Sequence, residues 1–399
     1  MSSSPKPRAK QAPSTHPTQS LWHASKQYSL SLGCQGCFYR PDCGGLEVQA
    51  NVFDCTDFCR CEDRAACDTV CPNHPVNLAA RLQEVRGLKL DNVSPAPNLA
   101  YQPLPASIPL ISHGSRREAP LMVSAVALPL AQLVDFASGQ VKFATRAALH
   151  GEFHLGCDVK IVLTGTARDK YLERWWALAD RESVIQDLKN LGIALITTPN
   201  FSLFNDVPRL DNLYNIKRIA LTWSEIQAGG LPCAPHLNAR TDHDWYRWTQ
   251  FLAAHGEIDT VSVEFGTGAG YETRIAWHVE QLTQLAEKLA RPMRLIVRGG
   301  VQVLPLLVQA FSSVTLIDSR PFFKTVRRQR AMSINGVLRW QKAPTDPGAP
   351  LDELLQHNVA IVEGDLARSL GRTNLRLTAA PLGRYETSGA ANDARDEPL

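Results

Sequence analysis

The sequence predicts an α/β protein in which a TIM-type (β/α)8-like barrel is preceded by a small cysteine-rich metal-binding module. Two observations predict the barrel: beyond residue 108 short apolar runs alternate with amphipathic stretches, and seven or eight such units follow one another. This repetition is typical of a parallel sheet covered by helices. A third observation predicts the module, because eight of the ten cysteines lie between Cys34 and Cys71. A doubly wound open sheet is the alternative fold, but no Gly-x-Gly-x-x-Gly fingerprint follows an early strand.

Composition divides the chain into five parts. Residues 1–25 are rich in Ser, Pro, Lys and Gln and are predicted to be disordered. The cysteine-rich module is expected over residues 26–76. A linker or arm follows over residues 77–107, opening with a short helix and continuing in a proline-rich stretch. The barrel is predicted over residues 108–380, and a flexible polar tail over residues 381–399.

The eight clustered cysteines are predicted to be metal ligands. They are Cys34, Cys37, Cys43, Cys55, Cys59, Cys61, Cys67 and Cys71. Eight thiolates fit two tetrahedral four-cysteine zinc sites, and they also fit one four-iron cluster with one zinc site. Disulfides are the less favoured alternative, because the first residues lack the apolar stretch of a secretory signal. Closed sites consume all eight ligands, so the metal is expected to stabilise the fold rather than to take part in catalysis.

The predicted strands are short apolar runs. Seven of them are Leu121–Val126, Val159–Thr164, Ile193–Thr197, Pro232–His236, Thr260–Phe265, Met293–Arg298 and Val314–Asp318. An eighth comes either from Ile108–Ser112 or from Val359–Val362. Between the strands, apolar residues recur at helical spacing. The predicted helices are Asp169–Leu191, Leu210–Ala228, Asp242–His255, Tyr271–Ala290 and Val301–Phe311.

Polar residues gather at the predicted carboxyl ends of the strands, where barrel enzymes place their chemistry. The candidate catalytic residues are Asp206, Glu264 and Asp318. The candidate substrate-binding residues are Asn200, Phe201, Ser202, His236, Asn238, Tyr271 and Arg298. Glu264 is the most informative, because a charge inside Val-Ser-Val-Glu-Phe is costly unless it is paired or lies at a strand end. The alternatives are a structural Glu264–Arg298 ion pair and helix N-cap roles for the two aspartates.

A basic run follows the last predicted strand. At helical spacing Lys324, Arg327 and Arg328 share one face, and they are the candidate contacts to a nucleic-acid backbone. A solvated helix face is the alternative. The net charge of +3 is too small for an argument from the whole molecule, so any such contact must be local. No window approaches the roughly 18 apolar residues of a membrane span, so a cytoplasmic protein is expected.

Two segments carry a resemblance to known families. Thr198-Pro-Asn-Phe-Ser-Leu-Phe-Asn-Asp-Val-Pro-Arg209 and Gly229-Gly-Leu-Pro-Cys-Ala-Pro-His-Leu-Asn238 resemble signature blocks of a domain family of unknown function common in phages and mobile elements. The upstream Cys-x2-Cys and Cys-Gly-Gly arrangement resembles cysteine clusters attached to relatives of that family. The wider architecture is similar to tRNA-guanine transglycosylase-like enzymes, which are TIM barrels with a metal site. It also resembles anti-phage DNA glycosylases that excise glucosylated hydroxymethylcytosine.

The resemblance implies a DNA glycosylase-like hydrolase that cleaves the N-glycosidic bond of a modified base in anti-phage defence. Double-stranded phage DNA is then the expected partner, and base flipping gives access to the bond. Transglycosylases carry their zinc ligands late in the chain and include a histidine, whereas the cysteines come first here. Three other functions stay open: a base-exchanging transglycosylase on tRNA or DNA, a metal-dependent hydrolase or nuclease, and a non-catalytic zinc-bearing nucleic-acid-binding protein. The chain contains no His-x-His or His-Glu-x-x-His motif, which argues against the metal-dependent hydrolase.

Overall fold

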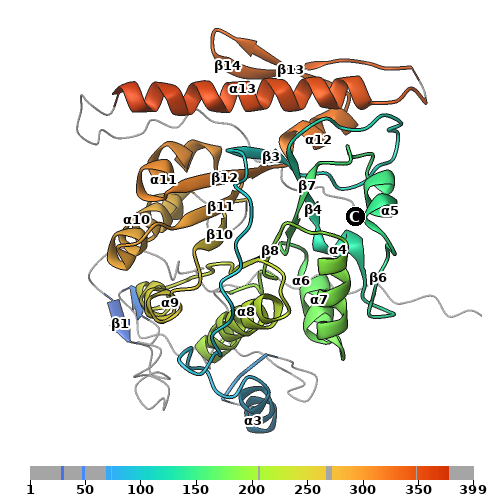
Figure 1. Ribbon diagram of the computed structural model, residues 1–399. Coiled ribbons are helices and arrows are strands. Elements are labelled where there is room, and N and C mark those ends of the chain that lie inside the picture. The colour runs from blue at the N-terminus through green and yellow to red at the C-terminus, as the bar shows by residue number, and fades with distance from the viewer. Residues whose placement is uncertain are drawn as a thin grey trace, which may run out of the picture.

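Parallel strands enclosed by helices make up most of the computed structural model (Figure 1). The structure describes residues 69–376, except 73, 205–206, 267–271 and 347, together with the backbone of two short strands at 28–30 and 47–49. Side chains at 272–273 and 371–376 are not described. Over these residues the prediction of an α/β protein with parallel sheets is confirmed.

Eight parallel strands form two four-stranded sheets, with the orders β4-β7-β8-β9 and β10-β11-β12-β3. The strands are β3 (Ser107–Pro109), β4 (Ala125–Pro129), β7 (Lys160–Thr164), β8 (Leu195–Thr197), β9 (Cys233–Ala234), β10 (Thr260–Glu264), β11 (Arg294–Arg298) and β12 (Ser313–Asp318). Single parallel bridges link the sheet edges: Leu110 pairs with Ala127 next to β3 and β4, and His236 pairs with Ser262 next to β9 and β10. Neighbours in space therefore follow the chain order of these eight strands.

Most predicted strands agree with the structure to within two or three residues at each end. β4 is the exception, since it begins at Ala125 rather than Leu121. Leu121 instead forms a separate bridge with Leu155. The eighth strand is the one predicted near Ile108, whereas Val359–Val362 lies inside a helix.

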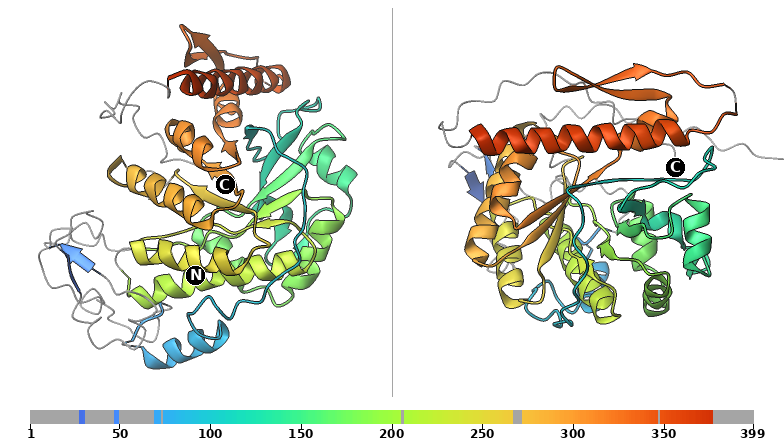
Figure 2. Two further views of the ribbon diagram at one scale, coloured as in Figure 1. Left: turned by 60° about the vertical axis from the view of Figure 1, so that its left-hand side comes forward. Right: turned by 45° about the horizontal axis from the view of Figure 1, so that its top comes forward.

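The helices lie outside the strands, as both views of Figure 2 show. They are α3 (Pro75–Glu84), α4 (Leu130–Leu133), α5 (Arg146–Glu152), α6 (Asp169–Trp176), α7 (Arg181–Asn190), α8 (Arg209–Ala228), α9 (Asp242–Ala254), α10 (Glu272–Leu289), η2 (Val301–Val303), α11 (Leu304–Ala310), α12 (Arg320–Val326) and α13 (Asp352–Arg376). The single helix predicted over 169–191 is two helices, α6 and α7. The break has a local cause, because the Asp180 carboxylate accepts a hydrogen bond from the backbone N–H of Ser183 (2.9 Å) and starts α7 anew.

Alternate residues of the strands belong to two separate hydrophobic clusters. On β7, Ile161 and Leu163 pack into the large cluster that includes the helices, whereas Val162 belongs to a small cluster built almost entirely from the strands. The small cluster also contains Ala234 and Ile296, on β9 and β11. Because side chains alternate between the faces of a strand, residues two positions along from these lie on the same face. We call the face of the small cluster the inner face.

The proline-rich arm lies against the amino ends of the strands. The Tyr101 hydroxyl lies 3.1 Å from the hydroxyl of Thr260, and the Arg294 guanidinium lies 4.0 Å from the centre of the Tyr101 ring. The Thr315 hydroxyl donates to the carbonyl of Pro105 (3.0 Å), and Tyr101 packs against the inner cluster. The arm therefore covers the amino end of the strands and leaves the polar carboxyl ends facing the other way.

The long helix α13 packs where the segment between β3 and β4 has no helix (Figure 1). The Gln356 side chain makes two hydrogen bonds with the backbone of Met122, at 3.0 and 3.1 Å, and the Asp352 carboxylate accepts from the N–H of Glu118 (2.9 Å). Three antiparallel pairs of strands complete the described structure: β1 (Tyr28–Leu30) with β2 (Glu47–Gln49), β5 (Val134–Asp135) with β6 (Gln140–Val141), and β13 (Gln329–Ile334) with β14 (Val337–Lys342). Among the described residues, no helix is long and apolar enough to cross a membrane.

Replacing Tyr101 by alanine should lower the free energy of unfolding by about 2–4 kcal/mol, because a half-buried ring is removed from the amino ends of the strands. Tyr101→Phe keeps the ring and loses only the hydrogen bond to Thr260, so it should cost about 1 kcal/mol. Urea unfolding followed by circular dichroism measures both. Wild-type stability in Tyr101→Ala would show that the arm is not part of the cooperatively folded unit.

Candidate active site

Three predicted residues meet at the carboxyl ends of β9, β10 and β11. Glu264 and Arg298 are direct partners in the strand register, and Arg298 Nη1 lies 3.6 Å from Glu264 Oε1. The same Arg298 nitrogen approaches the carbonyl of Thr166 at 3.4 Å. Glu264 is two residues beyond Ser262, which pairs with His236. His236 and Arg298 lie two residues beyond inner-cluster members Ala234 and Ile296, so both lie on the inner face.

The Glu264–Arg298 pair is an ion pair too long for a hydrogen bond. Its side chains are 7% and 20% exposed, so the pair lies at the boundary between the interior and the surface. Charges in such a place interact more strongly than they would in water. A carboxylate and a guanidinium held this way can stabilise charges of either sign that develop on a ligand.

His236 lies in the same cluster as a neutral imidazole. Burial, and secondly the positive charge of Arg298, lower the pKa of His236 to about 3. Its Nδ1 lies 3.4 Å from the hydroxyl of Ser262, and its backbone N–H donates to the hydroxyl of Thr198 (2.9 Å). At neutral pH the ring therefore offers one hydrogen-bond donor and one acceptor and carries no charge.

Two amides join the loops that follow β8 and β9. Asn238 Nδ2 donates to Asn200 Oδ1 (3.0 Å) and to the carbonyl of Phe201 (3.1 Å). Both amides are half-buried. Amide groups fixed in this way can read the donor and acceptor pattern of a planar base.

Glycines let the strand-end loops approach one another closely. A Cβ on Gly165 would lie 2.3 Å from the carbonyl oxygen of Thr198, so only glycine fits there. Gly299 has a φ of +72°, and a Cβ on it would lie 2.9 Å from the nitrogen of Gly266. The loop after β11 therefore contacts the loop after β10 directly beside Glu264.

Three predicted site residues lie elsewhere. The Asp318 carboxylate faces away from the inner cluster and forms a bidentate pair with Arg320, at 3.0 and 2.6 Å. Phe201 is completely buried, with the Arg218 guanidinium 4.0 Å from its ring centre, so its ring faces are not open to a stacking base. The hydroxyl of Ser202 donates to the carboxylate of Asp169 (2.6 Å).

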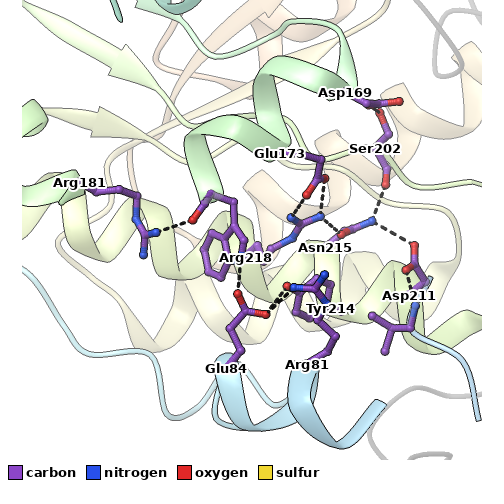
Figure 3. Close-up of polar contacts among 12 residues, drawn as sticks. Arg81, Glu84, Asp169, Glu173, Arg181, Ser202, Asp211, Tyr214, Asn215 and Arg218 are labelled. Carbon is purple, nitrogen blue, oxygen red and sulfur yellow. Dashed lines mark hydrogen bonds and ion pairs between the residues drawn. The ribbon is translucent and has the colours of Figure 1, made fainter. Parts of the chain in front are cut away.

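Figure 3 shows the polar network on the outer side of α6 and α8 to which Ser202 belongs. The Glu84 carboxylate of α3 accepts hydrogen bonds from Trp176 Nε1 (2.6 Å) and the Tyr214 hydroxyl (2.7 Å). Arg218 forms a bidentate pair with Glu173, at 2.6 and 2.9 Å. Ser202 and α3 thus belong to one polar network on the helices. This network is distinct from Glu264, Arg298 and His236, which we call the strand-end cluster.

The predicted basic run does not form one helix face. α12 ends at Val326, and Arg327 follows as an exposed residue. Arg328 has a φ of +52° and donates to the hydroxyl of Thr345 (2.8 Å). Lys324 lies over the ring of Trp340, at 5.8 Å from its centre. These cations therefore point in different directions, because the chain leaves the helix between them.

Several predicted residues lie outside the described residues: Asp206, Tyr271, Cys34, Cys37, Cys43, Cys55, Cys59, Cys61 and Cys67. Cys71 is described and is buried. Over the described ranges there is no group of three or more His, Cys, Asp or Glu side chains arranged to hold a metal ion.

Sequence reasoning missed a second polar group near the strand ends, formed by Arg209, Arg240, Arg274 and His278 around Asp244. The signal was present, since a basic residue lies at or near the beginning of three successive helices, where the helix dipole disfavours cations. A cavity of about 530 Å³ lies between α7 and the end of α8, beside the Arg181–Glu225 ion pair. None of its lining residues belongs to the strand-end cluster.

Comparison with protein-family models and with curated proteins finds no match for this chain.

Acidification should destabilise the protein through His236. The folded chain releases this proton near pH 3 and the unfolded chain near pH 6.5, so between these values the unfolded state binds more protons. The free energy of unfolding should fall as the pH is lowered through this window, and His236→Gln should lose about 2 kcal/mol less than the wild type between pH 7 and pH 5. Urea unfolding at the two pH values measures the difference. Parallel pH dependence in both proteins would show that His236 is not held neutral.

Proposed function

We propose that this protein cleaves the N-glycosidic bond of a modified base in nucleic acid, with Glu264 as the carboxylate beside the sugar. The observation that carries the proposal is the meeting of Glu264, Arg298 and neutral His236 at the carboxyl ends of three adjacent strands. Departure of a base builds positive charge at C1′ of the sugar, and a carboxylate beside C1′ stabilises that charge or bonds to it.

We also propose that the eight strands belong to one (β/α)8 barrel. The chain order of neighbouring strands supports it, as do the parallel bridges next to β3–β4 and next to β9–β10. The inner cluster supports it too, since it takes residues from seven of the eight strands. In such a barrel the carboxyl ends of the strands form the catalytic face.

The remaining side chains suit the binding and orientation of a flipped nucleotide. The neutral His236 ring and the Asn200–Asn238 amide pair would bind the edge of the base. Arg298 would bind a phosphate or sugar oxygen while offsetting the charge of Glu264. Water then supplies the oxygen that bonds to C1′ and gives up one proton, while the electron pair of the broken C1′–N bond leaves with the base, which takes up a proton.

The proposed substrate is double-stranded phage DNA in the cytoplasm, cleaved as part of anti-phage defence. Support comes from the resemblance of segments 198–209 and 229–238 to a domain family common in phages and mobile elements. Lys324, Arg327 and Arg328 stay proposed as backbone contacts, although they act at separate points rather than along one helix face.

Glu264→Gln should reduce base release by roughly 10²–10³-fold or more, the size that loss of one electrostatic stabiliser costs. The amide keeps the shape of the side chain but removes its charge. Free base measured by mass spectrometry, and abasic sites measured by alkali-induced strand breakage, report the reaction on plain and modified phage DNA. The matched control is Glu225→Gln, which removes the carboxylate of the Arg181–Glu225 ion pair between α7 and α8 and should leave the rate unchanged.

Base release that survives Glu264→Gln would exclude Glu264 as the carboxylate at the sugar. Incorporation of a labelled free base into the DNA would favour a transglycosylase over a hydrolase. Salt-dependent DNA binding with no base release on any substrate would favour the non-catalytic alternative. Activity that is lost in EDTA and restored by Mg²⁺ or Mn²⁺ would favour a metal-dependent hydrolase.

The cysteine-rich segment is proposed to hold structural metal, with zinc favoured over an iron–sulfur cluster. The full-length protein should carry about two metal ions per chain, because eight thiolates fill two tetrahedral sites. Metal analysis after gel filtration measures this, and acid-labile sulfide distinguishes an iron–sulfur cluster. Removal of the metal should lower the thermal unfolding temperature. A metal-free protein with all eight cysteines in disulfides would contradict the proposal.

A further inference from the structure

Ser262 is the buried neighbour of His236 in the strand-end cluster. The two residues pair in the single parallel bridge next to β9 and β10. His236 is 3% exposed and Ser262 is 2% exposed. Backbone hydrogen bonds hold the bridge on both sides, from the N–H of Ser262 to the carbonyl of Pro235 (2.9 Å) and from the N–H of Leu237 to the carbonyl of Ser262 (2.8 Å). The hydroxyl of Ser262 is therefore held next to the imidazole ring.

This hydroxyl has two neighbours at the same distance. Its oxygen lies 3.4 Å from the carbonyl oxygen of Pro235 and 3.4 Å from Nδ1 of His236. The hydroxyl has one hydrogen, and a carbonyl oxygen can only accept. Both contacts become hydrogen bonds when the hydroxyl donates to Pro235 and accepts from an N–H at Nδ1. The opposite arrangement, in which the hydroxyl donates to Nδ1, makes one hydrogen bond instead of two.

The chain of hydrogen bonds decides which nitrogen of the neutral imidazole carries the proton. A neutral ring has one N–H and one lone pair, and the partner at one nitrogen sets the role of the other. With the proton on Nδ1, Nε2 is an acceptor. Among the described residues Nε2 has no hydrogen-bond partner. Since buried polar atoms are nearly always paired, Nε2 is the atom that remains for a ligand beside Glu264 and Arg298.

An acceptor at Nε2 suits the binding of a base better than the transfer of a proton. The pKa of His236 is lowered to about 3 by burial and then by Arg298, whereas a group that transfers protons works best with a pKa near the working pH. The proton on Nδ1 faces Ser262 inside the protein. The proton that a departing base takes up therefore comes from a donor other than His236.

We propose that Ser262 is a positioning residue that keeps the proton of His236 on Nδ1, so that Nε2 accepts a hydrogen bond from an N–H group of the bound base. Exocyclic amino groups and ring N–H groups of bases are donors of this kind. The position of the proton depends on the contacts of Ser262 alone. That the ligand is a base rests on the function proposed above.

Nuclear magnetic resonance measures the position of the proton in the ligand-free, full-length protein at pH 7. With nitrogen-15 in the histidines, long-range proton–nitrogen correlation spectra distinguish a protonated ring nitrogen from an unprotonated one. The chain has 11 histidines, and the signals that are missing from His236→Gln identify His236. The expected result is a protonated Nδ1 and an unprotonated Nε2. A protonated Nε2, alone or together with Nδ1, would overturn the proposal.

Ser262→Ala should move the proton to Nε2. Without the hydroxyl, a proton on Nδ1 would be buried with no acceptor, so the other form of the ring becomes the more stable one. Ser262→Thr keeps a hydroxyl and should keep the proton on Nδ1. The matched control is Ser224→Ala, which removes a buried hydroxyl that donates to the carbonyl of Ser94 and should leave the His236 signals unchanged.

Thermal unfolding checks that each serine variant is folded. Alanine at position 262 removes one oxygen and adds nothing, so this variant decides the question even if the larger threonine is not accommodated. An unchanged proton position in folded Ser262→Ala would show that Ser262 does not set the tautomer.

Steady-state kinetics of base release then test the role of Nε2. In Ser262→Ala a hydrogen on Nε2 faces a hydrogen of the base, so KM should rise about tenfold while kcat changes by less than about twofold. Ser262→Thr and Ser224→Ala should keep the KM of the wild type. A fall in kcat at unchanged KM would show that His236 acts on the departing base, and it would overturn the acceptor role.

Two further outcomes separate the role of Ser262 from the proposed activity. If the wild type releases no base from any DNA, but the proton lies on Nδ1 and moves in Ser262→Ala, then Ser262 sets the tautomer, and both the activity and the base as ligand fall. If base is released and Ser262→Ala changes neither the proton position nor KM, the activity stands and the positioning role falls.

Discussion

The alternation of side chains along the parallel strands is the constraint on which the rest of the structure depends. On β9, β10 and β11 every second residue lies on the inner face, so His236, Glu264 and Arg298 lie beyond Ala234, Ser262 and Ile296. A shift of β10 by one residue would exchange Glu264 with Val263 and put a carboxylate among the helices. The same rule turns Asp318 outward, where Arg320 pairs with it.

The proline-rich arm covers the amino ends of the strands and leaves their carboxyl ends for a ligand. Tyr101 and its neighbours in the arm satisfy Thr260, Arg294 and Thr315, so the amino ends need no ligand. At the other end, charges of both signs lie at or near the surface. The carboxylate of Glu264 and the guanidinium group of Arg298 lie there as a pair, 3.6 Å apart. Such a separation of charge suits a ligand with a developing cation at one point and an anion at another.

Strand and helix positions could be predicted well from the sequence because their apolar periodicity is local. The strand runs from Val159 onward and the three helices α8–α10 were correct to within two or three residues. The break between α6 and α7 could not be predicted from periodicity, since it comes from a single capping carboxylate at Asp180. The predicted start of β4 was wrong, because Leu121 lies before the strand and forms a separate bridge with Leu155.

The candidate site was harder to predict than the fold. Parallel strands are apolar on both faces, so the pattern Val-Thr-Leu-Ile-Asp on β12 does not reveal which face is inner. Asp318 was therefore expected beside Glu264, and only the packing shows that it faces the helices. Phe201 was expected to stack on a base because it lies in a strand-end loop. In the structure Trp176 and Arg218 enclose its ring. Glu264, Arg298 and His236 do lie on one face, and their catalytic and binding roles stay predictions.

The position of α13 has a consequence for the order in which this chain can fold during synthesis. The stretch from Arg116 to Met122 emerges early during synthesis, but its backbone partners, Asp352 and Gln356, are more than 200 positions further on. Until the ribosome has released that late segment, the flank beside β3 has no cover and its peptide groups must stay hydrated. Nascent chains of this protein should therefore depend on chaperones until α13 has been synthesised.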